Sequence, residues 1–324
     1  MALRLHLVPH GTKIDFFRHA WATFGASVVA TILSLVAVAV LGLNYGIDFK
    51  GGTTVRTEST NAIDVSAYRT ALEGLNLGDV TITEVFDPAF RPDQHVAQVR
   101  IEAQGDSEVA DPAVIDRMEE ALKAVDPAVK FTQVESVGPK VSGELIWTAF
   151  LAVGAASLGI GLYIWMRFEW QYAVGAVAAL IHDVVVTVGL FSVLGLKFDL
   201  TTVAALLTIM GFSMNDTVVV FDRLRENLQK YKTMPLRDVM NLSVNETLGR
   251  TLMTVMTTLL ALIALIVFGG DVLRTFVIAI TWGIIVGTYS SIYMAKNIVL
   301  FLGLPRGDKP AAPKKGGEFA NIDA

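Results

Sequence analysis

Three charged side chains lie inside long apolar stretches of this sequence. Asp216 lies in the run that ends GFSMNDTVVVFDRLREN (residues 211–227), and Arg250 lies near the start of the next apolar run. Asp183 follows His182 in the middle of an earlier run. A charged group inside a bilayer costs about 2.5–3.5 kcal/mol on insertion scales, so it usually faces protein or a water cavity. Each of the three is therefore a candidate functional residue.

The positions of Asp216 and Arg250 predict that their side chains meet. Asp216 lies about six residues, or roughly 9 Å at 1.5 Å per residue, from the end of its run. Arg250 lies about one turn into the following run, and a charged loop joins the two runs. Both side chains should therefore lie at a similar depth on the same side of the membrane. If the two helices are neighbours, the arginine can reach the carboxylate.

Hydroxyl side chains extend this polar group. Four of them recur at spacings of 4, 3 and 4, which places them on one helical face next to the face that bears Arg250: Thr247, Thr251, Thr254 and Thr258. Together with Asn215 and Asp216, they could line a polar strip through a helical bundle.

The chemistry that a buried aspartate–arginine pair supports is reversible proton binding. The carboxylate can titrate, arginine stays charged, and the distance between them controls the proton affinity. Movement of Arg250 away from Asp216 would favour proton uptake, and its return would favour release. One alternative is that the pair and the threonines only hold helices together. Another is that Asp216 is an interfacial carboxylate near the headgroups, and His182 could be an ordinary buried histidine.

Six transmembrane helices are the elements that must position these residues. The chain has 324 residues and a mean hydropathy of +0.53, and 18% of its residues are charged, against about a quarter in soluble domains. It contains no cysteine, which excludes disulfides, thiolate catalysis and Cys-based metal sites. Its apolar residues form runs of about the length that spans a bilayer: 21–43, 145–166, 172–194, 200–221, 246–268 and 273–295.

Lysine and arginine in the short loops predict the orientation of the spans. Basic residues gather in segment 1–20 and in the loop 222–245: Arg4, Lys13, Arg18, Arg223, Arg225, Lys230, Lys232 and Arg237. The short loops on the opposite side offer only Lys197 and Arg274. We therefore expect both termini in the cytoplasm and residues 44–143 outside it.

The first apolar run has a second interpretation as a cleaved signal peptide, because Ala37-Val38-Ala39 matches an A-x-A cleavage pattern. That triplet lies inside the run, however, and the segment before the run is long for the amino-terminal region of a signal peptide. The orientation of the other spans is the same in either case. At the opposite end, residues 297–324 are expected to form a cytoplasmic tail that is too short for a domain.

Segment 44–143 predicts a small α+β domain. It carries 17 acidic and 9 basic residues, which suits exposure to water. Alternating apolar residues predict strands, while Asp64 and Asp111-Pro112 predict helix starts. The elements follow in the order strand 53–58, helix 64–75, strand 80–86, strand 95–102, helix from 112 and strand 129–137. This order is that of a ferredoxin-like domain. We find no nucleophile, base and orienting residue placed together in it, so we interpret it as a binding or mechanical module.

Glycines mark two further positions. The segment 46–54, GIDFKGGTT, nearly matches a phosphate-binding loop, but Gly52 occupies the lysine position and no strand precedes it, so we expect a flexible exit from the first span. In the last run, Gly283 and Gly287 form a G-x-x-x-G motif, which indicates closely packed helices.

Four segments resemble the SecF family of bacterial protein-export subunits, which belongs to the resistance-nodulation-division superfamily. They are GIDFKGGT (46–53), VGPKVSGEL (137–145), NDTVVVFDRLREN (215–227) and GTYSSIYMAKNI (287–298). They occur in order, and the resemblance covers about residues 14–303. It implies a membrane α-helical fold of six transmembrane helices, with a periplasmic α+β ferredoxin-like domain between helices 1 and 2.

The resemblance also implies a function and its residues. Members of this family pair with SecD in the bacterial inner membrane and use the proton-motive force to help draw unfolded preproteins from the SecYEG channel. YajC and YidC are further candidate partners, and neither catalysis, a cofactor, a metal nor nucleic acid is expected. The family's proton-coupling aspartate and arginine fall on Asp216 and Arg250, and Asp183 is a weaker candidate for the same path. Phe212 and Met214 stand where relatives often have Tyr and Ile, which leaves the polar motif intact.

Two other functions remain as alternatives. A half-transporter of the same superfamily would export small molecules or lipids, although a single six-span half with so small an exposed domain argues against it. A purely structural scaffold of the export channel would retain full activity after Asp216→Asn and Arg250→Met.

Overall fold

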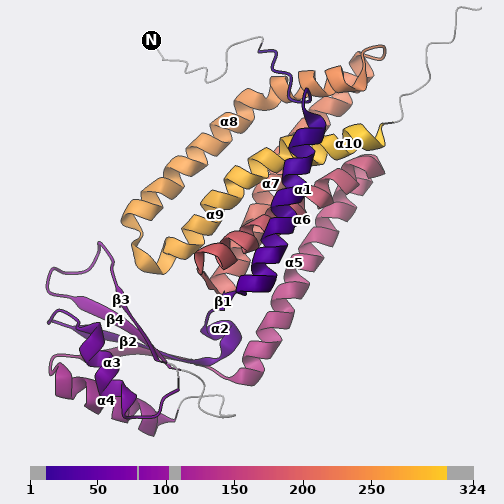
Figure 1. Ribbon diagram of the computed structural model, residues 1–324. Helices are drawn as coiled ribbons and strands as arrows, with labels where there is room; N and C mark the ends of the chain where they lie inside the picture. Colours follow the sequence, from indigo (N-terminus) through magenta and orange to yellow (C-terminus); the bar gives the residue numbers. More distant parts are fainter. Residues whose placement is uncertain (1–11, 79, 102–110, 305–324) are drawn as a thin grey trace, which may run out of the picture.

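The computed structural model describes residues 12–78, 80–101 and 111–304, and it contains a long helical bundle with a small α+β domain at one end (Figure 1). Within these residues, six helical spans are long and apolar enough to cross a membrane. The α+β domain lies between the first and second of them in the chain. The predicted fold class is therefore confirmed. Arg4 and most of the predicted tail lie outside the described residues.

Five spans contain the predicted apolar runs, most of them extended at one or both ends, whereas the first helix ends at Leu41 and not at 43. The bundle helices are α1 (Ala20–Leu41), α5 (Pro139–Arg167), α6 (Trp170–Leu194), α7 (Leu200–Lys230), α8 (Leu236–Phe268) and α9 (Gly270–Ser290). After α9 the chain continues through a π-helical turn, η1 (Ser291–Ala295), into α10 (Lys296–Leu302). The last span therefore reaches Leu302 rather than ending at 295.

The loop that hydropathy predicts at 222–245 is mostly helical. Both α7 and α8 extend into it, and only residues 231–235 are not helical. Arg223 Nε donates to Glu246 Oε2 at 2.7 Å, and Asn227 Nδ2 donates to the same oxygen at 2.7 Å. These bonds join the two helices beyond their apolar parts. Hydropathy ends a span where polar residues begin, and it therefore misses such a helical extension.

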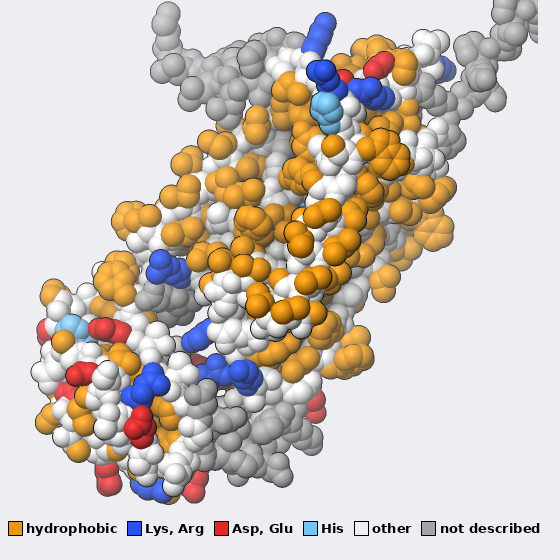
Figure 2. Space-filling view, in the orientation of Figure 1, with side chains coloured by type: hydrophobic (Ala, Val, Ile, Leu, Met, Phe, Trp, Pro, Cys, Tyr) orange, Lys and Arg blue, Asp and Glu red, His pale blue; other side chains and the backbone are white. Residues whose placement is uncertain are grey.

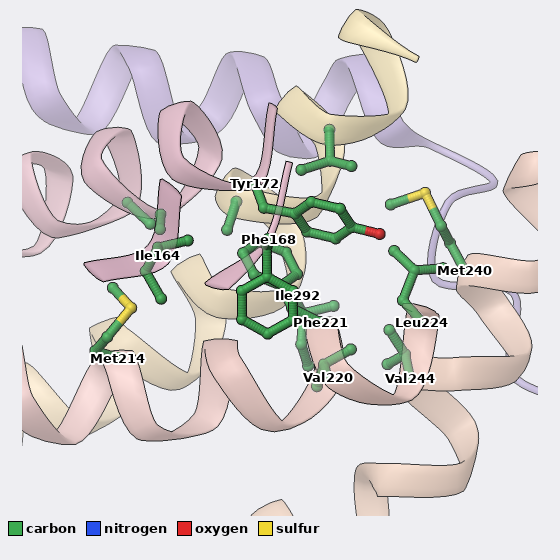
Figure 3. Packing of buried hydrophobic residues seen from close by; sticks show 14 of the residues in the cluster. Ile164, Phe168, Tyr172, Met214, Val220, Phe221, Leu224, Met240, Val244 and Ile292 are labelled. Carbon is green, nitrogen blue, oxygen red and sulfur yellow. The ribbon is translucent and has the colours of Figure 1, made fainter. Parts of the chain in front are cut away.

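Helix α6 lies at the centre of the bundle, where it contacts α1, α5, α7, α9, η1 and α10. At one end an aromatic cluster joins it to α7: the rings of Tyr172 and Phe221 meet edge to face with centroids 4.7 Å apart, and Phe168 contacts both (Figure 3). By contrast, α1, α5 and α8 leave many large apolar side chains exposed. On the face shown in Figure 2, these side chains cover the bundle between charged ends, as expected of a surface that meets lipid.

The α+β domain has a four-stranded antiparallel sheet in the order β3-β4-β2-β5, with two helices packed on one face. Its elements are β2 (Gly52–Ser59), α3 (Val65–Glu73), β3 (Val80–Val85), β4 (His95–Ile101), α4 (Pro112–Val125) and β5 (Lys130–Val137). The predicted order of elements is confirmed. Asp64 and Asp111 cap the two helices as expected, because each carboxylate accepts hydrogen bonds from backbone N–H groups of the first turn.

A buried carboxylate fastens the core of this domain. Asp126, just after α4, is 6% exposed and accepts hydrogen bonds from Asn61 Nδ2 at 2.7 Å and Tyr68 Oη at 2.9 Å. Burial alone would raise the pKa of Asp126, but the hydrogen bonds from Ser59, Asn61 and Tyr68 outweigh it and hold this pKa below 3.8. The ionised carboxylate therefore stabilises the folded domain.

The glycine-rich exit forms an ordered joint between bundle and domain. It consists of two short strands paired in parallel and one helical turn, namely β1 (Asn44–Tyr45), β6 (Lys197–Phe198) and α2 (Ile47–Lys50). Asp48 Oδ2 accepts a hydrogen bond from the N–H of Leu200 at 3.0 Å, which ties the exit to the start of α7. Gly51 and Gly52 have φ values of 73° and 130°, which favour glycine. The predicted flexible exit is thus corrected to a glycine turn that tertiary contacts fix.

Segments predicted to share one side of the membrane do lie at one end of the bundle. Arg237, at the start of α8, donates to Asp15 Oδ2 at 2.6 Å, and Asn241 Oδ1 accepts from the N–H of Phe16 at 2.9 Å. The amino-terminal segment therefore contacts the first turns of α8, while the domain lies at the other end of the bundle, near β1 (Figure 1). That the first of these ends faces the cytoplasm stays a prediction.

Candidate functional site

Asp216 is a buried carboxylate with few partners. It lies in the middle of α7, and its side chain is 4% exposed. Its Oδ1 accepts one long hydrogen bond, from Thr251 Oγ1 of α8 at 3.4 Å. Its Oδ2 has no hydrogen-bond partner within the described parts of the chain. Most buried carboxylate oxygens are paired, so this atom needs a specific explanation.

Arg250 does not pair with Asp216 in this conformation. The arginine lies on an exposed part of α8, and the contact from α8 to the carboxylate comes from the next residue, Thr251. Consecutive residues of an α-helix point about 100° apart, so a helix that turns Thr251 toward α7 turns Arg250 away from it. The prediction from depth thus placed the two groups on neighbouring helices correctly, but the predicted contact is not made. Arg250 still exerts a weaker electrostatic attraction on Asp216.

The threonine stripe reaches Asp216 through only one of its members, Thr251. The other three donate their hydroxyl groups to carbonyls of their own helix, as threonines inside helices often do: Thr247, Thr254 and Thr258. Asn215 is exposed on the surface of α7. The polar strip predicted from the sequence is therefore not a continuous chain of contacts in this structure.

Asp183 has a complete set of hydrogen-bond donors. It is 0% exposed in α6, and its Oδ2 accepts from Ser213 Oγ of α7 at 2.7 Å and from Ser290 Oγ of α9 at 2.8 Å. Its Oδ1 lies 3.0 Å from Nδ1 of the buried His182. The carboxylate therefore joins three helices, and both of its oxygens have partners.

The two glycines of the G-x-x-x-G motif let α9 approach α7 beside this group. A Cβ on Gly287 would lie 3.0 Å from Ser213 Cβ and 3.5 Å from Asp183 Oδ2, and one on Gly283 would collide with the side chain of Ile209. The close packing expected at this motif is therefore present, and it brings Ser290 within reach of Asp183.

Lys296 is a buried cation of this region that the sequence reasoning missed. It is the first residue of α10, it is 0% exposed, and its Nζ has no hydrogen-bond partner among the described residues. The ammonium lies 5.6 Å from the ring centroid of Phe221. Lys296 also exerts an electrostatic attraction on Asp216. The signal that could have revealed it is the apolar segment IVLFL (298–302), which places the lysine inside a span instead of at its end.

In the described ranges, no group of three or more His, Cys, Asp or Glu side chains is arranged to hold a metal ion. The charged side chains of this region can perform acid–base chemistry. A buried carboxylate whose Oδ2 has no hydrogen-bond partner among the described residues, and which two basic side chains attract, can bind and release a proton.

Comparisons with known proteins agree with this architecture. The family described as "Protein export membrane protein SecD/SecF, C-terminal" matches residues 117–304, and the "SecD/SecF GG Motif" matches residues 36–63. A relative from Cereibacter sphaeroides named "Protein translocase subunit SecF" is 68% identical over 324 residues, which is 100% of both chains. A "Protein translocase subunit SecDF" from Brucella abortus is 39% identical over 318 residues, covering 98% of this chain and 41% of that one.

A solved structure has the same fold. The crystal structure of SecDF from Thermus thermophilus, described as a translocon-associated membrane protein, superposes with a TM-score of 0.78 at 35% identity. The match covers 90% of this chain and 39% of that one.

A six-span bundle with charged residues in its interior and a ferredoxin-like domain after the first span defines a class of multi-pass membrane protein. Within that class the matches are specific, and the chain belongs to the SecF family of protein-export membrane proteins. Its fold and relatives indicate a multi-pass protein of the inner membrane. Relatives that join SecD and SecF in one chain support partnership with SecD.

Proposed function

We propose that the chain helps to move preproteins across the cytoplasmic membrane and that protons passing through Asp216 down their gradient supply the energy. The observation that carries this proposal is the buried Oδ2 of Asp216, which has no hydrogen-bond partner among the described residues. A carboxylate kept in that environment is costly unless a proton or a cation reaches it during function. Protein export is the activity named for its relatives.

The coupling step follows from the position of Arg250. In the present conformation Arg250 is exposed on α8 and does not touch the carboxylate, so Asp216 is free to take up a proton. Rotation or sliding of α8 against α7 would bring the arginine to Asp216. Its positive charge would then favour the ionised carboxylate and release of the proton. Alternation between these two arrangements would couple proton passage to helix movement.

The joint between bundle and domain supports a mechanical output. The exit segment is tied to the start of α7 by the bond from the N–H of Leu200 to Asp48. A movement of α7 would therefore pull on the first strand of the α+β domain. We propose that this domain lies in the periplasm, that both termini are cytoplasmic, and that the domain acts on unfolded preprotein as it emerges.

The proposed assembly follows from the relatives. SecD would supply the second six-span half, and the pair would work beside the SecYEG channel, with YajC and YidC as further candidates. The proton gradient drives the cycle in this proposal, so no cofactor is required.

An export assay in cells tests the proposal. Asp216→Asn and Arg250→Met should each abolish the contribution of the protein to export, with unchanged amounts in the membrane. Asp222→Asn is the matched control, because Asp222 lies on the same helix but pairs with Arg167 on the surface. Full export by the first two variants would instead support a purely structural scaffold.

A further inference from the structure

Two buried polar atoms of opposite charge have no hydrogen-bond partner among the described residues, and both belong to the interior of the bundle. One is Oδ2 of Asp216 on α7, and the other is Nζ of Lys296 on α10. Both side chains are almost wholly buried, at 4% and 0% exposure, and they carry opposite charges. No direct ion pair joins them, but both lie at α7: Asp216 is part of this helix, and the ammonium of Lys296 lies 5.6 Å from the ring centroid of Phe221, five residues further along it. A buried charge without a hydrogen-bond partner is costly, and a buried charge of opposite sign would explain why each of the two is retained.

Other ionisable groups near Asp216 have partners of their own or lie further away. From α6, Asp183 is bonded to serines, and His182 lies against it. From α5, Arg167 pairs with Asp222 at the end of the bundle. From α8, Arg250 is exposed, and from η1 the titratable side chain is Tyr293. Among the side chains that the structure describes, Lys296 of the last span is the one buried lysine or arginine.

We propose that Lys296 is the resident counter-charge of Asp216, which balances the carboxylate while Arg250 is withdrawn. This inference rests on the proposed function in which Asp216 carries the proton. In it Lys296 is a positioning residue, and it acts only through the carboxylate. Arg250 comes and goes with helix movement, whereas Lys296 stays inside the bundle. Lys296 would balance the charge of Asp216 in one arrangement of the helices, and Arg250 would add its charge in the other.

The local helix geometry explains why the side chain of Lys296 lies inside the bundle. The π-helical turn η1 ends at Ala295, directly before Lys296. Such turns insert an extra residue into a helix, change the direction of the residues that follow, and are frequent at functional sites. Here the turn sets the rotation of α10 at which Lys296 points into the bundle.

The competing explanation is that Lys296 only packs on the ring of Phe221. A cation–π contact at 5.6 Å is favourable, but it does not pair with the free oxygen of Asp216. The two explanations predict different behaviour when both charges are removed together. Loss of a counter-charge leaves a buried carboxylate unpaired, which lowers the stability of the protein. This loss of stability disappears if the carboxylate is removed too.

A double-mutant cycle on the purified full chain with SecD tests the proposal. We expect Lys296→Met to lower the melting temperature by about 5 °C, as removal of one partner of a buried pair does. The double variant Asp216→Asn with Lys296→Met should regain at least half of that loss. Lys232→Met, on an exposed lysine, is the control and should change nothing. If Lys296→Met alone fails to accumulate in the membrane but the double variant does accumulate, the second substitution rescues the first. That result would also support the proposal.

Proton flux in vesicles gives the second measurement, one that a packing role would not move. Removal of a cation near a carboxylate favours proton binding, so Lys296→Met should shift the midpoint of the flux-against-pH curve to higher pH by about one unit. The proposal would be overturned if the two substitutions have additive effects and the midpoint of the flux-against-pH curve does not move. Equal failure of Lys296→Met and of the double variant to accumulate counts as an additive effect. Undiminished flux through Asp216→Asn would instead refute the proposed function, and the melting cycle would still decide the pairing.

Discussion

Asp183 and Asp216 are two buried carboxylates of the same bundle with opposite surroundings. Asp183 accepts hydrogen bonds from serines on two other helices and contacts His182. Among the described residues, Asp216 accepts one hydrogen bond, at 3.4 Å, and its Oδ2 has no partner. Burial is therefore common to both, and hydrogen-bond satisfaction is what separates them.

The difference separates a structural role from a functional one. A fully bonded carboxylate stabilises one arrangement of helices, because any movement breaks its bonds. A carboxylate with a free oxygen resists movement less and can accept a proton or a new cation. We therefore interpret Asp183 as the fixed point of α6, α7 and α9, and Asp216 as the group that changes state.

The largest expected effect is the loss of proton flux in Asp216→Asn. In vesicles that contain the protein with SecD, flux should fall by about a hundredfold, because an amide cannot carry the proton. The measurement is acidification of the vesicle interior under an imposed gradient. Asp183→Asn, at matched amounts of folded protein, should keep most of the flux. An equal loss in both variants would remove the functional distinction between the two carboxylates.

Replacement of Asp183 by leucine should have the largest effect on stability. The change leaves Ser213, Ser290 and His182 without their acceptor, at a cost of about 3 kcal/mol. The corresponding drop in melting temperature is about 6–12 °C. Asp222→Leu, on the surface of α7, is the control and should stay within about 1 kcal/mol of the parent protein. A stable Asp183→Leu variant would contradict the assigned structural role.

The glycines beside Asp183 should give a smaller loss. Gly287→Ala places a methyl group 3.0 Å from Ser213 Cβ, and Gly283→Ala forces one against Ile209. Overpacking of this kind costs about 1–3 kcal/mol and should separate Ser290 from the carboxylate. Thermal unfolding of the purified protein measures the effect. Gly154→Ala is the matched control, since nothing lies within 4 Å of its added Cβ.

The smallest effect concerns Asp126, a satisfied carboxylate in the water-exposed domain. Its pKa is lowered in the folded state, so its stabilisation is fully present above the ordinary value of 3.8 and is lost as the pH falls through the lower folded value. Hydrogen exchange of the domain amides, corrected for the intrinsic effect of pH, should therefore speed up below about pH 4. In Asp126→Asn, the free energy of unfolding of the domain should fall by about 1 kcal/mol less on acidification than in the parent protein. Unchanged acid dependence in that variant would assign the effect to other carboxylates.

The spans and the domain could be predicted from the sequence because their signals are local. Six apolar runs of sufficient length predict six helices, and Asp64 and Asp111 mark helix starts through bonds to their own first turns. The depth of Asp216 and the neighbourhood of α7 and α8 also followed from residue positions. Charged helical extensions, such as the one that carries Arg223, were missed because hydropathy ends where they begin.

The partners of the buried charges could not be predicted in the same way. Ser213 and Ser290 are 30 and 107 residues away from Asp183, and no local pattern connects them. Arg250 and Thr251 are adjacent in the chain, so depth cannot say which of them faces Asp216. Lys296 was assigned to a span boundary because the apolar segment after it was counted as tail.

Local patterns in the sequence are enough to predict six membrane spans, a ferredoxin-like domain after the first of them, and charges inside the bundle. Helix packing determines what surrounds these charges: Asp183 is fully hydrogen-bonded, Oδ2 of Asp216 has no partner among the described residues, and Lys296 is buried in the same bundle. The physical reason is that hydropathy reports depth, which is a position along one axis. The rotation of each helix and the identity of its neighbours depend on packing between segments far apart in the chain.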